Sequence, residues 1–143
     1  MKIFRRILFY LISFTWGGIM SCIGLLVIGC LAPFKRVHVY HGRLYGVVGK
    51  YWGGLELGCF FICDANNGTR LKNHECGHGL QNCIWGPLML FVITIPSAIR
   101  YWYRERLSKR NYDKYKQLPD YDAIWFEGQA TRWGTKYVET DLW

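Results

Sequence analysis

Residues 74–78 read His74-Glu75-Cys76-Gly77-His78, an instance of the pattern H-E-x-x-H. On a helix, side chains four residues apart lie on the same face, so both imidazoles can bind one divalent metal ion. The glutamate beside the first histidine points toward a metal-bound water molecule that it could deprotonate. The alternative is a helix on which the two histidines only cap or pack. The pattern therefore predicts a metal site on a helix.

A third ligand has to come from elsewhere, because hydrolytic zinc usually takes three protein ligands and leaves the fourth position to water. Glu127 is the strongest candidate, since it lies in the apolar-flanked segment 125–130, where an unpaired carboxylate would be costly. His38 and His41 are also available, but their odd spacing in a predicted strand points them to opposite faces. The alternative for Glu127 is a surface position or an ion pair with Arg132.

Four stretches together resemble a known family. They are the run 73–81 (NHECGHGLQ), Gly86-Pro87, Ile95-Pro96-Ser97, and Phe126-Glu127-x-x-Ala130-x-x-x-Gly134. The pattern resembles the gluzincin group of zinc metallopeptidases and, more narrowly, a group of small bacterial membrane-associated HExGHxxQ proteins. The likeness covers about the last two-thirds of the chain.

The resemblance implies a Zn²⁺ ion bound by His74, His78 and Glu127, with Glu75 as the general base that acts on a peptide or protein substrate. Gluzincins often place an aspartate after the ligand glutamate to orient a histidine, and Thr131 stands at that place here. A hydroxyl group can accept the imidazole hydrogen bond, but it supplies no charge. For the group that stabilises the oxyanion, only Tyr137 can be suggested.

A structural zinc site is a competing interpretation. Cys59-x3-Cys63, followed by the histidine pair, comes close to the spacing of a Cys2His2 finger. If residues 57–63 form one extended strand, the two sulfur atoms lie roughly 13 Å apart, too far to share a metal. A finger would also leave Glu75 unexplained. The corresponding alternative function is a non-catalytic integral membrane protein with a structural metal site or none.

Two apolar runs predict contact with a membrane. No charge occurs from Ile7 to Phe34, which is long enough to cross a bilayer with some tilt. We expect an uncleaved anchor helix in residues 1–34, with a signal peptide or a lipoprotein lipidated at Cys30 as alternatives. The second run, 83–99, is short for a span and contains two prolines.

The metal site limits how these runs can lie. If both crossed the bilayer, the histidines and Glu127 would be on opposite sides and could not share a metal. We therefore expect the second run to be partly buried in the membrane without crossing it. An intramembrane protease is the remaining alternative, but Arg70 and Lys72 just before the motif make deep burial expensive.

The predicted fold is α+β, with residues 1–34 as the membrane anchor and 35–143 as a zincin-like metal-binding domain. Short β-prone runs at 37–41, 43–48 and 55–63, separated by glycines, predict a small antiparallel sheet. A turn at 64–69, with Asn67-Gly68 as its strongest signal, leads to the metal helix, which Thr69 would cap. The second apolar helical segment and a ligand helix from Ile124 to near Gly134 follow.

The charge distribution agrees with a membrane partner. The net charge is +8, and the stretch Arg100–Lys116 contains seven basic residues against two acidic ones. Such a cluster suits anionic lipid headgroups. Nucleic acid is not expected as a partner, because no nucleic-acid-binding motif accompanies the charge. The six cysteines are interpreted as buried free thiols. The resemblance places the protein in the bacterial inner membrane.

Overall fold

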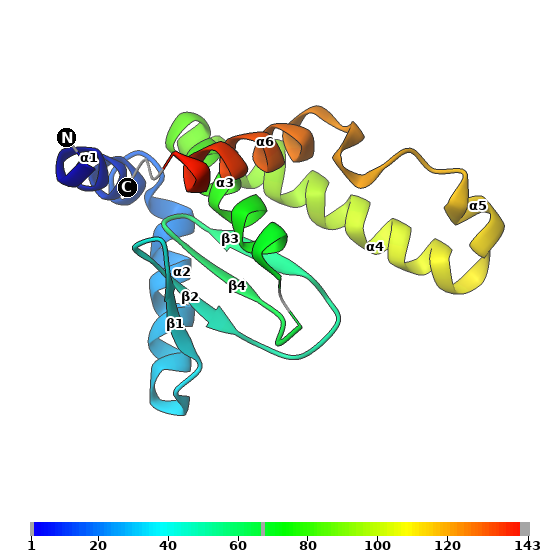
Figure 1. The fold of residues 1–143 in the computed structure, drawn as a ribbon, viewed down its shortest axis with the longest axis horizontal. Coiled ribbons are helices and arrows are strands. Elements are labelled where there is room, and N and C mark those ends of the chain that lie inside the picture. Colours follow the sequence, from blue (N-terminus) through cyan, green and yellow to red (C-terminus); the bar gives the residue numbers. More distant parts are fainter. Residues whose placement is uncertain (1, 67, 141–143) are drawn as a thin grey trace.

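The computed structural model describes residues 2–66 and 68–140. These residues form six α-helices and one four-stranded sheet, so the predicted α+β class is confirmed (Figure 1). The helices are α1 (Lys2–Phe14), α2 (Gly18–Leu31), α3 (Thr69–Trp85), α4 (Ile95–Arg110), α5 (Tyr112–Lys116) and α6 (Trp125–Glu139). The strands are β1 (Val37–Tyr40), β2 (Arg43–Val47), β3 (Gly54–Leu57) and β4 (Phe60–Cys63).

The first apolar run is not one straight helix. It is divided into α1 and α2, which are bent by 97° relative to each other, so residues 1–34 do not form the one continuous helix that was predicted. Anchoring of this segment in a membrane stays a prediction. The break falls at Gly17, where a β-carbon would overlap the amide of Asn82. That amide also donates to the Gly17 carbonyl at 3.4 Å. Within residues 2–66 and 68–140, no single helix is long and apolar enough to cross a membrane.

The sheet is mixed, with the strand order β1-β2-β4-β3. The outer pairs are antiparallel hairpins, whereas β2 and β4 run parallel, so the predicted antiparallel sheet is wrong for the central pair. The predicted strand 55–63 is in fact two strands, because Gly58, with φ +74°, turns the chain after Leu57. His41 and Gly42 both have positive φ, as a type I′ turn between β1 and β2 requires.

Helices cover both faces of the sheet. Gly46 of β2 lies against Leu31 of α2, whereas Gly54 of β3 lies against Glu75 of α3. The main core brings α1, α2, the sheet and the later helices together, and its buried members are Phe9, Met20, Ile28, Leu57, Cys59, Phe60, Met89, Ile93 and Phe126. The N-terminal helices therefore share one core with the rest of the described chain.

The second apolar run, 83–99, is also bent. It includes the end of α3, the 3-10 turn η2 (Gly86–Leu88), the π-helical segment η3 (Leu90–Thr94) and the start of α4, and the halves meet at 115°. Pro87 lies in the first turn of η2 and Pro96 in the first turn of α4, where a missing N–H is tolerated. The run is thus bent close to Pro87, as predicted, whereas helical backbone continues through Pro96 from Leu90 to Arg110.

The basic stretch 100–116 forms an arm of α4 and α5 that projects away from the sheet (Figure 1). Arg100 and Arg104 are half-buried against the returning chain, and lipid binding by the cluster stays a prediction. Arg100 donates to the carbonyls of Asp120 and Tyr121, and Arg104 donates to the carbonyl of Pro119. These bonds hold the returning chain, including η4 (Tyr121–Ala123), against α4.

Two predicted helix ends are wrong. Helix α3 begins at Thr69 with Gly68 at the cap position, so Thr69 is not the cap. Helix α6 continues to Glu139, beyond the predicted end near Gly134. Asn67, in the predicted turn before α3, lies outside the described residues.

Candidate metal site

Helices α3 and α6 approach each other through residues that have little or no side chain. A β-carbon at Gly77 would overlap the carbonyl of Ala130, and one at Gly134 would overlap the carbonyl of Asn73. The small residues of α6 therefore fit against the backbone of α3. This close approach brings the first turn of α6 against the histidines of α3.

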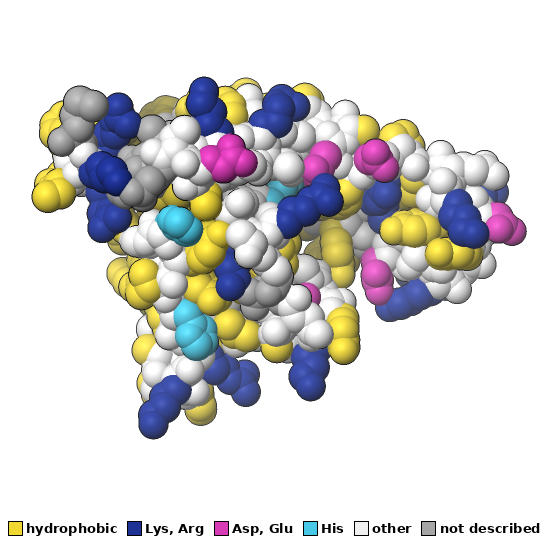
Figure 2. All heavy atoms as spheres, viewed as in Figure 1, with side chains coloured by type: hydrophobic (Ala, Val, Ile, Leu, Met, Phe, Trp, Pro, Cys, Tyr) yellow, Lys and Arg dark blue, Asp and Glu magenta, His cyan; other side chains and the backbone are white. Residues whose placement is uncertain are grey.

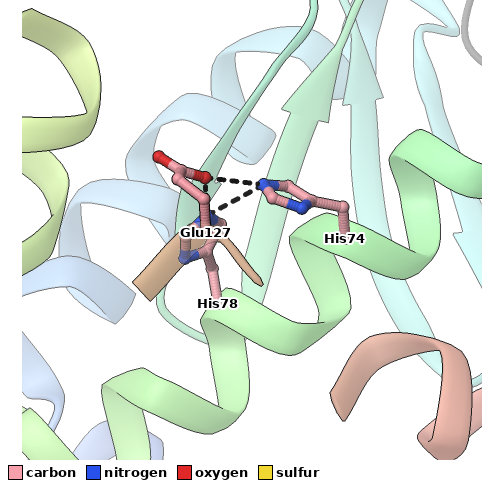
Figure 3. A group of neighbouring side chains, drawn as sticks. All are labelled: His74, His78 and Glu127. Atoms are coloured by element: carbon pink, nitrogen blue, oxygen red, sulfur yellow. Dashed lines mark hydrogen bonds and ion pairs between the residues drawn. The ribbon is translucent and has the colours of Figure 1, made fainter. Parts of the chain in front are cut away.

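The three predicted ligands converge on one point (Figure 3). The Oε2 atom of Glu127 lies 3.0 Å from Nε2 of His74 and 3.2 Å from Nε2 of His78, and the two Nε2 atoms are 3.0 Å apart. Zinc bonds of 2.0–2.1 Å in a tetrahedral arrangement separate neighbouring ligand atoms by roughly 3.3 Å. The spacing therefore fits a small tetrahedral ion. Metal ligation by these residues remains a prediction.

The other polar atom of each ligand is held by the protein. Nδ1 of His74 lies 2.8 Å from the Thr131 hydroxyl, the partner that the resemblance implied. Nδ1 of His78 lies 2.7 Å from Oε1 of Gln81. Partners of this kind orient a metal-binding imidazole and fix its tautomer. Both rings thus direct Nε2 to the common point.

Ser97 supplies the corresponding contact for the carboxylate. Its hydroxyl donates to Oε1 of Glu127 at 2.5 Å, which leaves Oε2 to face the two imidazoles. Ser97 belongs to the stretch Ile95-Pro96-Ser97 that carries part of the family resemblance, and no role was predicted for it. The contact could not have been expected from local sequence, because α4 and α6 meet only in the folded chain.

The hydrogen bonds of Gln81 fix a hydrogen on Nδ1 of His78. Its amide nitrogen donates to the Phe126 carbonyl and to Oε1 of Gln129, so its own oxygen must accept from Nδ1–H of His78. In the neutral form of His78, Nε2 then has a lone pair directed at the Glu127 carboxylate. Such an arrangement is repulsive unless a cation, either a proton on Nε2 or a metal ion, lies between the acceptors. The donor set of two imidazoles and one carboxylate is one that Zn²⁺ uses.

The electrostatics of Glu127 also favour an anionic ligand. The side chain is completely buried, and burial alone would raise its pKa. Hydrogen bonds from both histidines and from Ser97 outweigh burial, so the pKa of Glu127 is held well below its ordinary value. The predicted alternatives of a surface position or a pair with Arg132 are wrong, because Glu127 is buried against the histidines and Arg132 is exposed.

Glu75 lies beside the ligands and is 3% exposed. Burial raises its pKa to about 7; the charge of His78 lowers it, while that of Glu127 raises it. Gly54 of β3 leaves the space that this carboxylate occupies, since a β-carbon there would lie 2.7 Å from Oε1 of Glu75. A carboxyl with a pKa near neutrality can both accept and donate a proton.

The site opens into a cleft with a volume of about 710 Å³. His74, His78 and Glu75 line it together with β3, η3, α4 and η4. Strand β3 is an edge strand that pairs only with β4 among the described strands, and residues 53–56 border the cleft. The cleft can therefore admit an extended molecule along the sheet edge.

Tyr121 is a functional candidate that the sequence did not reveal. It lines the cleft, and its hydroxyl lies 3.3 Å from that of Ser97. Burial raises its pKa to about 12, so the phenol stays protonated and able to donate a hydrogen bond. Tyr137, the residue suggested as an oxyanion stabiliser, is 1% exposed in a core with Tyr45 and Phe61, and it is not among the residues that line the cleft.

Glu56 is a second carboxyl that was missed. It lies on β3, lines the cleft and is fully buried, and neither of its oxygens has a hydrogen-bond partner in the described chain. Burial raises its pKa far above the ordinary value, partly offset by the charge of Arg43 and reinforced by Glu75. The backbone N–H of Gly58 also lowers the pKa of Glu56, although the two groups do not meet the distance and angle of a hydrogen bond. The apolar flanks that identified Glu127 also surround Glu56.

Arg43 connects the sheet to the metal helix. Its buried guanidinium donates to the carbonyls of Gly58 and Cys59 in the β3–β4 turn and to the carbonyl of Cys76 in α3. Gly79 provides the space, since a β-carbon there would overlap the guanidinium. Arg43 therefore fixes the helix that bears the histidines.

The remaining candidates lie away from the site. Cys59 and Cys63 are buried, and burial raises the pKa of each thiol to about 11. His38 and His41 are exposed on and after β1. His74, His78 and Glu127 make up the one metal-capable group of His, Cys, Asp or Glu side chains found in residues 2–66 and 68–140.

Comparisons of the chain with protein-family models, with curated proteins and with solved structures found no match.

Proposed function

We propose that the protein is a zinc-dependent peptidase whose metal ligands are His74, His78 and Glu127. The observation on which this rests is the convergence of three ligand atoms at 3.0–3.2 Å, each on a side chain whose other polar atom is held by a protein partner. A zinc ion so bound would acidify water and polarise a carbonyl group.

The side chains around the ligands have the properties that hydrolysis needs. Glu75, with a pKa near neutrality, takes a proton from the attacking water and returns it to the leaving nitrogen of the substrate. Tyr121, which keeps its proton, donates a hydrogen bond to the oxygen of the scissile carbonyl. Ser97 keeps Glu127 in position throughout.

A polypeptide is the favoured substrate because the cleft borders an edge strand. The outer edge of β3 offers backbone donors and acceptors, with which an extended peptide can pair as an added strand. The cleft also supports a catalytic site over a structural one. Structural zinc sites are closed by four protein ligands, whereas this group has three and adjoins a cleft.

The test is cleavage of an unstructured protein or a peptide mixture by the zinc-loaded chain, followed by mass spectrometry of the new N-termini. Glu75→Gln should lower the cleavage rate by about 100-fold or more, while zinc remains bound. Glu139→Gln, an exposed glutamate on α6, is the matched control and should cleave normally. Unchanged cleavage by Glu75→Gln would contradict the role of this residue.

A further inference from the structure

The outer faces of two helical segments expose rows of large apolar side chains. On α1 these are Ile3, Phe4, Ile7, Leu8, Leu11 and Phe14, whereas Phe9 and Ser13 on the opposite face are buried. Along η2, η3 and α4 they are Leu88, Phe91, Ile95, Ile99 and Trp102. The second row repeats every three or four residues, as one face of a helix does.

The two rows meet where their segments bend. Trp16 lies between α1 and α2, and its indole N–H donates to the carbonyl of Ile84 at 3.1 Å. Both side chains are more than half exposed, at 53% and 59%. Trp16 also lies against Gly86, at the bend between α3 and η2. We call the two rows, with Trp16 and Ile84, the outer apolar face.

Basic residues flank the outer apolar face at both ends. They are Lys2 and Arg5 on α1, and Lys109, Arg110, Lys114 and Lys116 at the far end of the α4–α5 arm. Arg6 lies instead against Gly42 in the turn between β1 and β2. Figure 2 shows Lys and Arg side chains near the start of α1 on the left and around α5 on the right. Basic residues beside an apolar helix face are typical of helices that lie in the plane of an anionic bilayer.

The opposite side of the segment formed by η2, η3 and α4 faces the cleft. Met89, Ile93, Ser97 and Tyr101, at four-residue intervals, line it, and the first two are each 1% exposed. One helical segment therefore separates the cleft from the outer apolar face. Trp102 borders both, since it lines the cleft and is 67% exposed.

The lining of the cleft is itself largely apolar, with Leu55 and Leu71 opposite Met89, Ile93 and Ala98. We propose that the outer apolar face inserts into the headgroup region of an anionic bilayer, and that the cleft receives polypeptide segments with large apolar side chains from that surface. The statement about substrate rests on the proposed peptidase function. The statement about the bilayer does not.

Binding of the outer apolar face to a bilayer is tested by flotation of the full chain with phosphatidylcholine vesicles, with and without about one quarter phosphatidylglycerol. The wild type should float with the anionic vesicles. Phe91→Glu with Ile99→Glu should lower the bound fraction roughly tenfold or more. Val39→Glu with Leu44→Glu, at exposed positions on β1 and β2, is the matched control and should bind like the wild type.

Zinc content and circular dichroism confirm that each variant is folded. Equal flotation of the wild type and the Phe91/Ile99 variant would overturn the proposal. So would a wild-type dimer in sedimentation that this variant dissociates without any effect on vesicle binding, because the face would then bind a second copy.

Substrate delivery is tested with one peptide in two forms, soluble and anchored in anionic vesicles through an added apolar segment. The Phe91/Ile99 variant should cleave the soluble form like the wild type and the anchored form about tenfold more slowly. If the variant loses cleavage activity equally on both forms, or loses none on either form, substrate delivery from the membrane is overturned. If the wild type cleaves neither form, the peptidase proposal fails, while flotation still decides the bilayer proposal.

Discussion

Gly77 of α3 faces the backbone of Ala130 in α6 with no room for a side chain between them. The two residues are far apart in sequence, yet their contact determines whether the histidines and Glu127 can reach one point. The geometry of the proposed metal site therefore depends on the packing of two helices as much as on the identity of its three side chains.

Gly77→Ala should push α6 away and weaken zinc binding by at least about tenfold, with a loss of roughly 1–3 kcal/mol in the free energy of unfolding. A competition titration against a chromophoric chelator measures the affinity. Gly29→Ala in α2, where a β-carbon meets nothing within 4 Å, is the control and should bind zinc normally. Wild-type affinity in Gly77→Ala would contradict this account of the packing.

Thr131→Val should weaken zinc binding by about 10- to 100-fold, because Nδ1 of His74 loses the hydroxyl that lies 2.8 Å away. Valine keeps nearly the same shape, so the packing of α6 should not change. Thr131→Ser retains the hydroxyl and should restore most of the affinity in the same titration. Equal affinities for the valine and serine variants would show that the hydroxyl has no part in holding the imidazole.

Replacing Cys59 and Cys63 together by serine should leave zinc stoichiometry and affinity unchanged. Burial raises the pKa of both thiols to about 11, so near neutral pH they remain protonated and are poor metal ligands. Elemental analysis of the purified double variant measures the bound zinc. A loss of zinc would favour the finger-like interpretation over the histidine–glutamate site.

Part of this arrangement follows from sequence alone. The two histidines are four residues apart on a helix, and the apolar flanks of Glu127 indicate a buried carboxylate. Local sequence patterns are therefore enough to identify these three residues as candidate ligands. Gln81, Ser97 and Tyr121 gained their roles only in the structure, because each contact depends on packing between distant segments.

The errors in the predicted fold have the same origin. Hydropathy describes residues 7–34 as one run, but the break at Gly17 depends on Asn82, which lies in another helix. Likewise, the parallel pairing of β2 with β4 depends on the turn at Gly58 and on which strands become neighbours. Composition does not determine that order.

Glu56 gives the chain a specific pH dependence. Its pKa is raised in the folded protein, so it stabilises the fold below its ordinary pKa, and that contribution is lost as the pH rises through the raised value. In zinc-free protein, Glu56→Gln should therefore be more stable than the wild type at about pH 9, by roughly 1–3 kcal/mol, and similar to it near pH 5.

Urea unfolding at both pH values measures this difference, with Glu139→Gln as the exposed control. Both proteins retain Glu75, whose charge raises the pKa of Glu56, so the difference between them includes this coupling. A wild type that is more stable than Glu56→Gln at high pH would mean that the ionised carboxylate stabilises the fold as the counter-charge of Arg43.

The most direct test of the metal site is the zinc X-ray absorption spectrum of the protein loaded with one equivalent of zinc. Zinc bound by His74, His78 and Glu127 should show nitrogen and oxygen ligands at about 2.0–2.1 Å, with the outer-shell signals of two imidazoles and no sulfur. A sulfur shell at about 2.3 Å, or failure to bind one zinc per chain, would contradict the assignment of His74, His78 and Glu127 as its ligands.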